Sequence, residues 1–503
     1  MARGESVGAR TRASPIPRQI DALLVGAPKR PQICWNSSRN WKEAIMRYLK
    51  LTAILILEVL TLGVSGSAQA SPSMPIATFR ARRDRAMQAA ADAIILIRSR
   101  SSVMALNEVA FRQDPTFYYL TGLANAVGAL LVLDARRHES WLFVPEPGQL
   151  PGFGSLLHAP YGYVEPGSAS ADRLALDHIA SWNDFASFVD RRLAEDPTLV
   201  IRGPFRNDPA DAAPARLIGW DEAGLWESAL RVRWPQARFG PAPNANALRA
   251  LKDSTEVAVL RRVAASSSAA LHAGLAALRP GRRQREAEVD VVAACVRAGA
   301  ERVSFWPWLM TGSNSDIAVI MQLFADSRFL DRVMRAGELA HVDVGCAQEH
   351  YEGAVGRTAP VSGRFDAGQR EAWDLFVAAY RTALEMVKPG RTSQDVFAAW
   401  QAEFERRRPH LKTAFGKRTA DVALSAEAAK FWQMDGVGVA AAEGIIDTIQ
   451  VGQVLAIEPI LTVDGIGLYL QDMILVTPEG ADVLTKGLPY TATEIEAVMR
   501  ARR

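Results

Sequence analysis

The sequence has few cysteines and no cysteine pattern that binds metal. Only Cys34, Cys295 and Cys346 occur in 503 residues, with no Cys-x-x-Cys and no mixed Cys/His spacing. A disulfide framework and a zinc site of the Cys/His kind are therefore excluded. Cys34 precedes the expected start of the mature chain. For Cys295 and Cys346 we expect two buried free thiols rather than a bridge, since the sequence gives no geometry for a bond between them.

The body of the chain also lacks an excess of positive charge. The formal net charge is +3, from 58 Lys and Arg against 55 Asp and Glu. Residues 1–45 alone carry +5 and residues 46–70 carry +1, which leaves −3 for residues 71–503. A protein body without a basic footprint is not expected to bind nucleic acid.

No apolar run is long enough for a confident membrane span, but one has the pattern of a secretory leader. Residues 46–70 begin with a short basic segment, continue with the apolar run 51–64 and end in a small-x-small cleavage site at Ala68-Gln69-Ala70. We therefore expect a signal peptide at residues 46–70 and an exported protein, periplasmic or secreted, without a stable membrane anchor. Residues 1–45 are expected to be unstructured or not translated, with a buried N-terminal helix as the alternative.

The remaining chain divides into two segments with different patterns. In residues 71–238, helix-like stretches alternate with short hydrophobic runs at 93–97, 129–133 and 141–144, which is typical of an α/β domain. A Pro- and Gly-rich loop that begins at Phe239 marks the boundary. Residues 245–503 mix strands and helices as an α+β domain. The elements expected there are one helix from about Ala247 to the Pro280-Gly281 pair, a helix over 369–387, and strands over 339–344, 453–457 and 468–476.

Several short motifs follow one another in the second segment. They are the strand end VDVG with Asp343, the return YEGAVGRTAPVSG with Arg357, the strand GQVLAIEP with Glu458, and the final strand GLYLQDMILVT with Gln471. In this order they resemble the pita-bread metallopeptidases, the family of aminopeptidase P, prolidase and methionine aminopeptidase. The N-terminal segment FRQDPTFYYLTG resembles the companion domain of the aminopeptidase P branch.

The resemblance covers about residues 75–500 and implies a fold. It implies an α/β N-terminal domain of the creatinase/aminopeptidase P type at residues 71–238, followed by an α+β pita-bread metallopeptidase-like domain at residues 245–503. Analogy with the family also suggests a homodimer.

The resemblance further implies five metal-ligand positions. In the family these are Asp, Asp, His, Glu and Glu, which hold two divalent cations that polarise the substrate and activate a water. The first Asp corresponds to Asp343 and the first Glu to Glu458. The second Asp corresponds to Ala354, the His to Asp435 and the last Glu to Gln471.

The bridging ligands of the family, which contact both ions, correspond to Ala354 and Gln471. Alanine offers no donor and glutamine only a neutral carbonyl oxygen, so the resemblance argues against a dinuclear site. Asp435, Glu458 and Gln471 remain as an oxygen-only set for at most one manganese or zinc ion. The family's two substrate-side histidines are also missing, because one corresponds to Ala442 and the other would lie in residues 316–322, where no histidine occurs.

For several of these residues a structural role competes with the functional one. Asp343 and Glu458 lie on apolar strands, where an unpaired carboxylate is costly to bury, so a functional site or its remnant is favoured. Asp435 is either a ligand or a loop acid, and Gln471 is expected to hydrogen-bond Glu458 rather than to bind metal. Arg357 is assigned to substrate binding, with a structural ion pair as the alternative.

His341 lies two residues before Asp343, on the same face of its strand. It does not correspond to a ligand of the family, so a role in the core or at the surface is expected, and no catalytic residue is assigned.

Three functions remain open. The first is an exported Xaa-Pro aminopeptidase homologue, weak or inactive, that still binds proline-containing peptides. The second is a working hydrolase with one metal ion. The third is a metal-free hydrolase like the creatinase branch, which ranks last because the cleft histidine of that branch has no counterpart here.

Overall fold

The computed structural model of the chain describes residues 74–100, 112–146, 149, 164–204, 222–321, 330–444 and 447–501. The signal peptide expected at residues 46–70 and the segment before it lie outside the described residues. Within the described part, no helix combines the length and the apolar composition that crossing a membrane requires.

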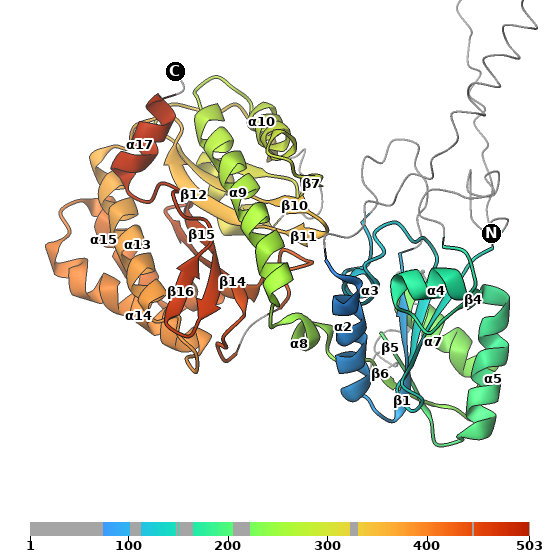
Figure 1. Cartoon of the computed structure of the whole chain (residues 1–503). Helices are drawn as coiled ribbons and strands as arrows, with labels where there is room; N and C mark the ends of the chain where they lie inside the picture. The colour runs from blue at the N-terminus through green and yellow to red at the C-terminus, as the bar shows by residue number, and fades with distance from the viewer. Residues whose placement is uncertain are drawn as a thin grey trace, which may run out of the picture. The chain divides into compact units, whose positions relative to one another are not determined.

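The N-terminal domain is built on a mixed sheet with the strand order β4-β3-β2-β1-β5-β6 (Figure 1). The strands are β1 (Ala93–Arg98), β2 (Leu130–Asp134), β3 (Glu139–Val144), β4 (His178–Ser181), β5 (Val200–Gly203) and β6 (Arg238–Pro241). The helices are α2 (Ile76–Gln88), α3 (Pro115–Thr121), α4 (Ser168–Leu174), α5 (Phe185–Glu195) and α7 (Glu222–Arg233), with a 3-10 turn at Trp182–Asp184. The hydrophobic runs expected to form strands are therefore confirmed as β1, β2 and β3.

Both faces of this sheet are covered, which explains why the central strands β1 and β2 are largely apolar rather than alternating. Ile94 and Leu96 of β1 pack with Phe188 of α5 and Leu230 of α7. The intervening β1 side chains belong to the other core cluster, together with α2 and α3.

The boundary loop predicted at Phe239 is wrong in one respect. Residues Arg238–Pro241 form β6, which pairs in parallel with β5 at the edge of the sheet. Proline and glycine are compatible with an edge strand, because an edge residue need not donate to a second neighbour. The domain boundary therefore begins after Pro241.

The C-terminal domain is built on a larger sheet with the order β13-β14-β15-β12-β9-β8, with β16 paired to β15. Its strands are β8 (Trp308–Thr311), β9 (Leu339–Val344), β12 (Val355–Pro360), β13 (Trp432–Gly436), β14 (Val454–Val463), β15 (Ile466–Thr477) and β16 (Gly480–Val483). A small sheet in the order β11-β10-β7 consists of β7 (Arg302–Val303), β10 (Cys346–Gln348) and β11 (Tyr351–Glu352). The helices are α8 (Ala245–Arg249), α9 (Ser254–Ala277), α10 (Gln284–Arg297), α11 (Ile317–Ile320), α13 (Ala367–Glu385), α14 (Ser393–Arg407), α15 (Ala414–Ala423), α16 (Ala426–Lys430) and α17 (Ala492–Arg500), with 3-10 turns at Gly312–Ser315 and Arg408–His410.

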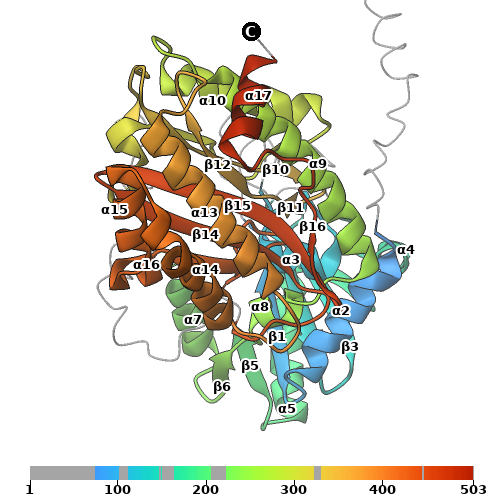
Figure 2. The same cartoon turned by 90° about the vertical axis from the view of Figure 1, so that its left-hand side faces the viewer.

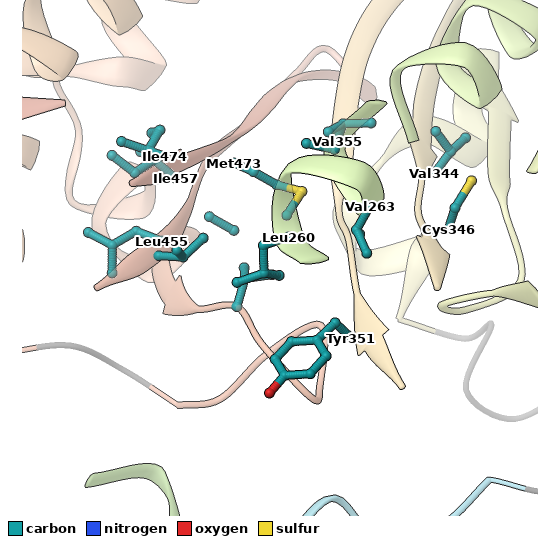
Figure 3. Close-up of a cluster of buried hydrophobic side chains, with 14 of the residues drawn as sticks. Leu260, Val263, Val344, Cys346, Tyr351, Val355, Leu455, Ile457, Met473 and Ile474 are labelled. Atoms are coloured by element: carbon teal, nitrogen blue, oxygen red, sulfur yellow. The ribbon is translucent and has the colours of Figure 1, made fainter. Parts of the chain in front are cut away.

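Long helices cover one face of the larger sheet. Figure 2 shows α13 lying across strands β15 and β14, and α9 running beside β10 and β12. A Cβ added at Gly274 of α9 would lie 3.2 Å from Val342 of β9, so the helix and the strand approach closely there. Figure 3 shows the buried cluster in which Leu260 and Val263 of α9 lie among side chains of the strands.

The single helix predicted from about Ala247 is interrupted, and this is a correction. α8 ends at Arg249 and α9 begins at Ser254. The Asp253 carboxylate accepts from the backbone N–H of Thr255 and Glu256, while the Glu256 carboxylate accepts from the backbone N–H of Asp253. This reciprocal capping box starts a new helix, and its Asp-x-x-Glu pattern is visible in the sequence.

The prediction of two free thiols is also wrong. The structure joins Cys295 of α10 to Cys346 of β10 by a disulfide, with the two Cα atoms 5.5 Å apart. Both side chains are fully buried. The bond links residues separated by 51 positions in the sequence, so only the fold, which places α10 beside the start of β10, reveals the pairing.

Candidate active site

The residues at the expected ligand positions lie on one face of the larger C-terminal sheet. Strand register places Asp343 of β9 opposite Gly356 of β12, and Gly356 opposite Gln471 of β15. The pairing of β14 with β15 on both sides of Glu458 aligns that residue with Gln471. Asp435 of β13 lies diagonally across from Glu458. Because residues directly opposite one another in a sheet point to the same side, the register brings these side chains together.

Gln471 contacts Glu458 directly. Its Nε2 donates to Glu458 Oε2 at 2.5 Å, and its Oε1 lies 2.8 Å from the hydroxyl of Tyr469. The same hydroxyl lies 3.1 Å from Glu458 Oε2, so it donates to one of two neighbouring acceptors. The prediction that Gln471 hydrogen-bonds Glu458 is confirmed. Tyr469 was missed, although strand alternation places it on the same face as Gln471.

Burial of several carboxyl groups together raises their pKa values. Burial and the charge of Glu458 raise the pKa of Asp343 well above its usual range, while contact with Tyr469 opposes the shift. Burial and the charge of Asp435 raise the pKa of Glu458 to about 7. Burial also raises the pKa of Asp435. The three carboxyls therefore share one poorly solvated region, and each makes ionisation of its neighbour more costly.

Three buried polar atoms at this site lack hydrogen-bond partners within the described residues. Asp343 is 7% exposed and its Oδ1 has no partner. His341 is 1% exposed, and neither Nδ1 nor Nε2 has one. Burial lowers the pKa of His341 to about 3, so its ring is neutral. The ring stacks on Tyr469 with centroids 4.0 Å apart and planes 10° from parallel. Of the core and surface roles expected for His341, the burial supports the core role.

On this face, β12 has no side chain at Gly356, the position opposite both Asp343 and Gln471, and Thr358, two residues further on, hydrogen-bonds the backbone of Tyr469. At Gly356, an added Cβ would lie 2.0 Å from Cε1 of Tyr469, so the tyrosine ring lies directly over the glycine backbone. Ala354 is two residues earlier, just before β12 begins, and is buried. The face therefore presents a tyrosine ring and a methyl group where the resemblance implies a bridging carboxylate.

The substrate-binding role predicted for Arg357 is not supported, and the alternative of a structural ion pair describes the residue. Arg357 is fully buried and its Nη2 pairs with Asp472 Oδ1 at 2.9 Å. Its other nitrogens donate to the backbone carbonyls of Pro489, Gly356 and Gln471. As the neighbour of Gly356 on β12, it points to the opposite face of the sheet.

The loop after Asp435 is fixed by a buried ion pair. Glu443 is 3% exposed, and it contacts Lys252 Nζ at 2.6 Å and Arg249 Nε at 3.4 Å. A Cβ added at Gly438 would lie 2.6 Å from the Glu443 carboxylate, so a larger residue there would displace the carboxylate from its ion pair. Ala442 precedes Glu443 and offers no donor to the site.

Within the ranges that the structure describes, no three His, Cys, Asp or Glu side chains are placed so that they could hold one ion. Asp343, Asp435 and Glu458 lie near one another, but they do not form such a group.

Comparisons with known proteins agree with this architecture. Residues 258–478 match the family model described as metallopeptidase family M24, and residues 79–150 match the aminopeptidase P N-terminal domain. The Xaa-Pro aminopeptidase of Haemophilus influenzae is 24% identical over 415 residues, which cover 77% of the chain and 88% of that protein. The Xaa-Pro aminopeptidase of Escherichia coli is 25% identical over 447 residues, which cover 83% of the chain and 95% of that protein.

A solved structure confirms the predicted fold class. Proline aminopeptidase P II from Yersinia pestis superposes with a TM-score of 0.67 at 22% identity, over 85% of the chain and 100% of that structure. The α/β domain followed by a pita-bread domain is therefore the fold of this chain.

Proposed function

We propose, from the premise that the chain belongs to metallopeptidase family M24, that it binds peptides with proline in second position and hydrolyses them weakly or not at all. The family implies the use of divalent metal ions.

The donor set does not fit a dinuclear centre. Of the two positions that bridge the ions in the family, Ala354 has no donor atom. At the other, Gln471 directs its Nε2, a hydrogen-bond donor, toward Glu458 at 2.5 Å. A donor N–H cannot be a ligand, because a ligand must present a lone pair to the ion. This contact between Gln471 and Glu458 is the observation that carries the proposal.

Peptide binding is supported by the carboxyl groups that the site retains. Asp435 and Glu458 are only partly buried, and no lysine, arginine or histidine within the described residues forms an ion pair with them. The free amino group of a peptide would supply the missing positive charge. The relatives are named for cleavage of Xaa-Pro bonds, and their names are the reason for proposing peptides with proline in second position.

Export is part of the same proposal. The leader-like pattern at residues 46–70 supports it. The disulfide between Cys295 and Cys346 adds independent support, because such bonds persist mainly in oxidising compartments.

A working enzyme with one metal ion is the second candidate. It is favoured by the electrostatic coupling of Asp435 to Glu458, which shows that the two carboxyls are close. With Gln471 they would form an oxygen-only site, provided that Gln471 turned its amide oxygen toward the ion.

The tripeptide Ala-Pro-Ala separates the two candidates. We expect calorimetry to show binding to the purified protein, and Glu458→Ala to weaken it by about tenfold. Glu427→Ala removes an exposed helical carboxylate and should change nothing. We expect hydrolysis to respond neither to added manganese nor to a chelator. Turnover that a chelator and Glu458→Ala both abolish would instead establish the one-metal enzyme, and an absence of binding would refute the proposed function.

A further inference from the structure

Tyr469 lies at the centre of the residues that correspond to metal ligands. Its hydroxyl oxygen is 2.8 Å from Gln471 Oε1 and 3.1 Å from Glu458 Oε2. The hydroxyl is also in hydrogen-bonding contact with the Asp343 carboxyl. The side chain is 1% exposed. Tyr469 does not itself correspond to a ligand of the family. The substitutions at the ligand positions therefore do not explain why a tyrosine hydroxyl lies among them.

A metal ion would need the place that this hydroxyl already fills. Divalent cations lie about 2.0–2.6 Å from their oxygen ligands. An ion held by Asp343, Glu458 and Gln471 would therefore lie between their oxygens. The Tyr469 hydroxyl oxygen already lies there, at hydrogen-bonding distance from Gln471 Oε1 and Glu458 Oε2. It also carries a proton, as a phenol ordinarily does near neutral pH. A protonated phenol is a hydrogen-bond donor to the carboxylates and a poor ligand.

The tyrosine ring has no room to move aside. On one side it lies over Gly356, where even a Cβ would be 2.0 Å from Cε1. It also stacks on His341, with ring centroids 4.0 Å apart. His341 is itself buried, and its ring also lies near that of Trp308. The glycine, the histidine and the tyrosine thus form one packed unit that fixes the hydroxyl among the acceptors.

We propose that the Tyr469 hydroxyl takes the place of the metal in this site, so that restoring the lost ligands is not enough to restore metal binding. The inference rests on the proposed function, in which the site works without a dinuclear centre. It adds that the metal position, besides lacking ligands, is filled by a side chain of the protein itself. The hydroxyl proton is donated to one of the acceptors that an ion would otherwise contact.

Manganese binding to a series of purified variants tests this inference. The parent variant combines Ala354→Asp, Asp435→His and Gln471→Glu, which restores the family's ligand types. Two further proteins add Tyr469→Phe or Tyr469→Ala to the parent. The matched control adds Tyr490→Phe, which removes a tyrosine hydroxyl bonded to Asp472 instead. Bound ions are counted by elemental analysis and affinity is measured by calorimetry, with circular dichroism as the check of folding.

We expect the parent and the Tyr490→Phe control to bind manganese weakly, and removal of the Tyr469 hydroxyl to tighten binding by about 100-fold. Equal affinity with and without Tyr469→Phe would overturn the inference, and so would folded variants that all fail to bind. If the parent does not fold, Gln471→Glu is compared with Gln471→Glu plus Tyr469→Phe, with the same expectation. Binding of two ions by the unaltered protein would refute the proposed function as well, whereas tight binding by the parent would refute this inference alone.

Discussion

Arg357→Met is expected to lower the free energy of unfolding by about 3–5 kcal/mol. The substitution leaves the Asp472 carboxylate fully buried without its cation, and it frees the carbonyls of Pro489, Gly356 and Gln471. A buried charge without a partner pays its full desolvation cost, which exceeds what the new side chain gains by packing. Urea denaturation followed by circular dichroism measures the loss.

Two controls separate the ion pair from a general effect of the substitution. Arg364→Met changes an exposed arginine and should stay within about 0.5 kcal/mol of the unaltered protein. The double variant Arg357→Met with Asp472→Leu should recover much of the loss, because no charge is then left unpaired. If Arg357→Met kept full stability but lost affinity for Ala-Pro-Ala, the residue would bind substrate after all.

Removing the disulfide is expected to cost about 2–4 kcal/mol. The bond closes a loop between Cys295 and Cys346 that spans 51 positions, and a cross-link of this span restricts the unfolded chain more than the folded one. Cys295→Ala with Cys346→Ala should lower the midpoint of urea denaturation accordingly. Reduction of the unaltered protein should produce a loss of similar size.

Thiol counting under denaturing conditions is the matching control. Without reductant, the unaltered protein should show no reactive thiol from Cys295 or Cys346, and with reductant it should show both. Two reactive thiols in the protein that was never reduced would mean that the bond does not form. The double alanine substitution would then lower the free energy of unfolding only by the amount that truncating two buried side chains costs.

Local patterns were sufficient for much of the fold. Strand β9 was predicted with the bounds Leu339–Val344, and all of its residues are buried although His341 and Asp343 interrupt the apolar pattern. The helix that became α13 was predicted two residues late, within the usual uncertainty of helix ends. The break between α8 and α9 was missed because an amphipathic pattern was followed through the capping box at Asp253.

The site was only partly predictable. Carrying over the motifs identified Asp343, Glu458 and Gln471, and the register then showed that they share one face of the sheet. Tyr469 could not be singled out, since a tyrosine on a β-strand is ordinary and only its contacts reveal its role. Arg357 was misassigned for a related reason. Its partner Asp472 is far away in the sequence, and only strand pairing brings the two residues together.

The number of metal ions bound per chain tests the central claim most directly. The purified protein is dialysed against manganese or zinc, washed, and analysed for metal content against protein concentration. We predict one ion per chain or none, because Ala354 and Gln471 cannot bridge two ions and Tyr469 fills the space between the remaining acceptors. Two ions per chain would contradict the account, and would mean that the protein is an active dinuclear exopeptidase with ligands not identified here.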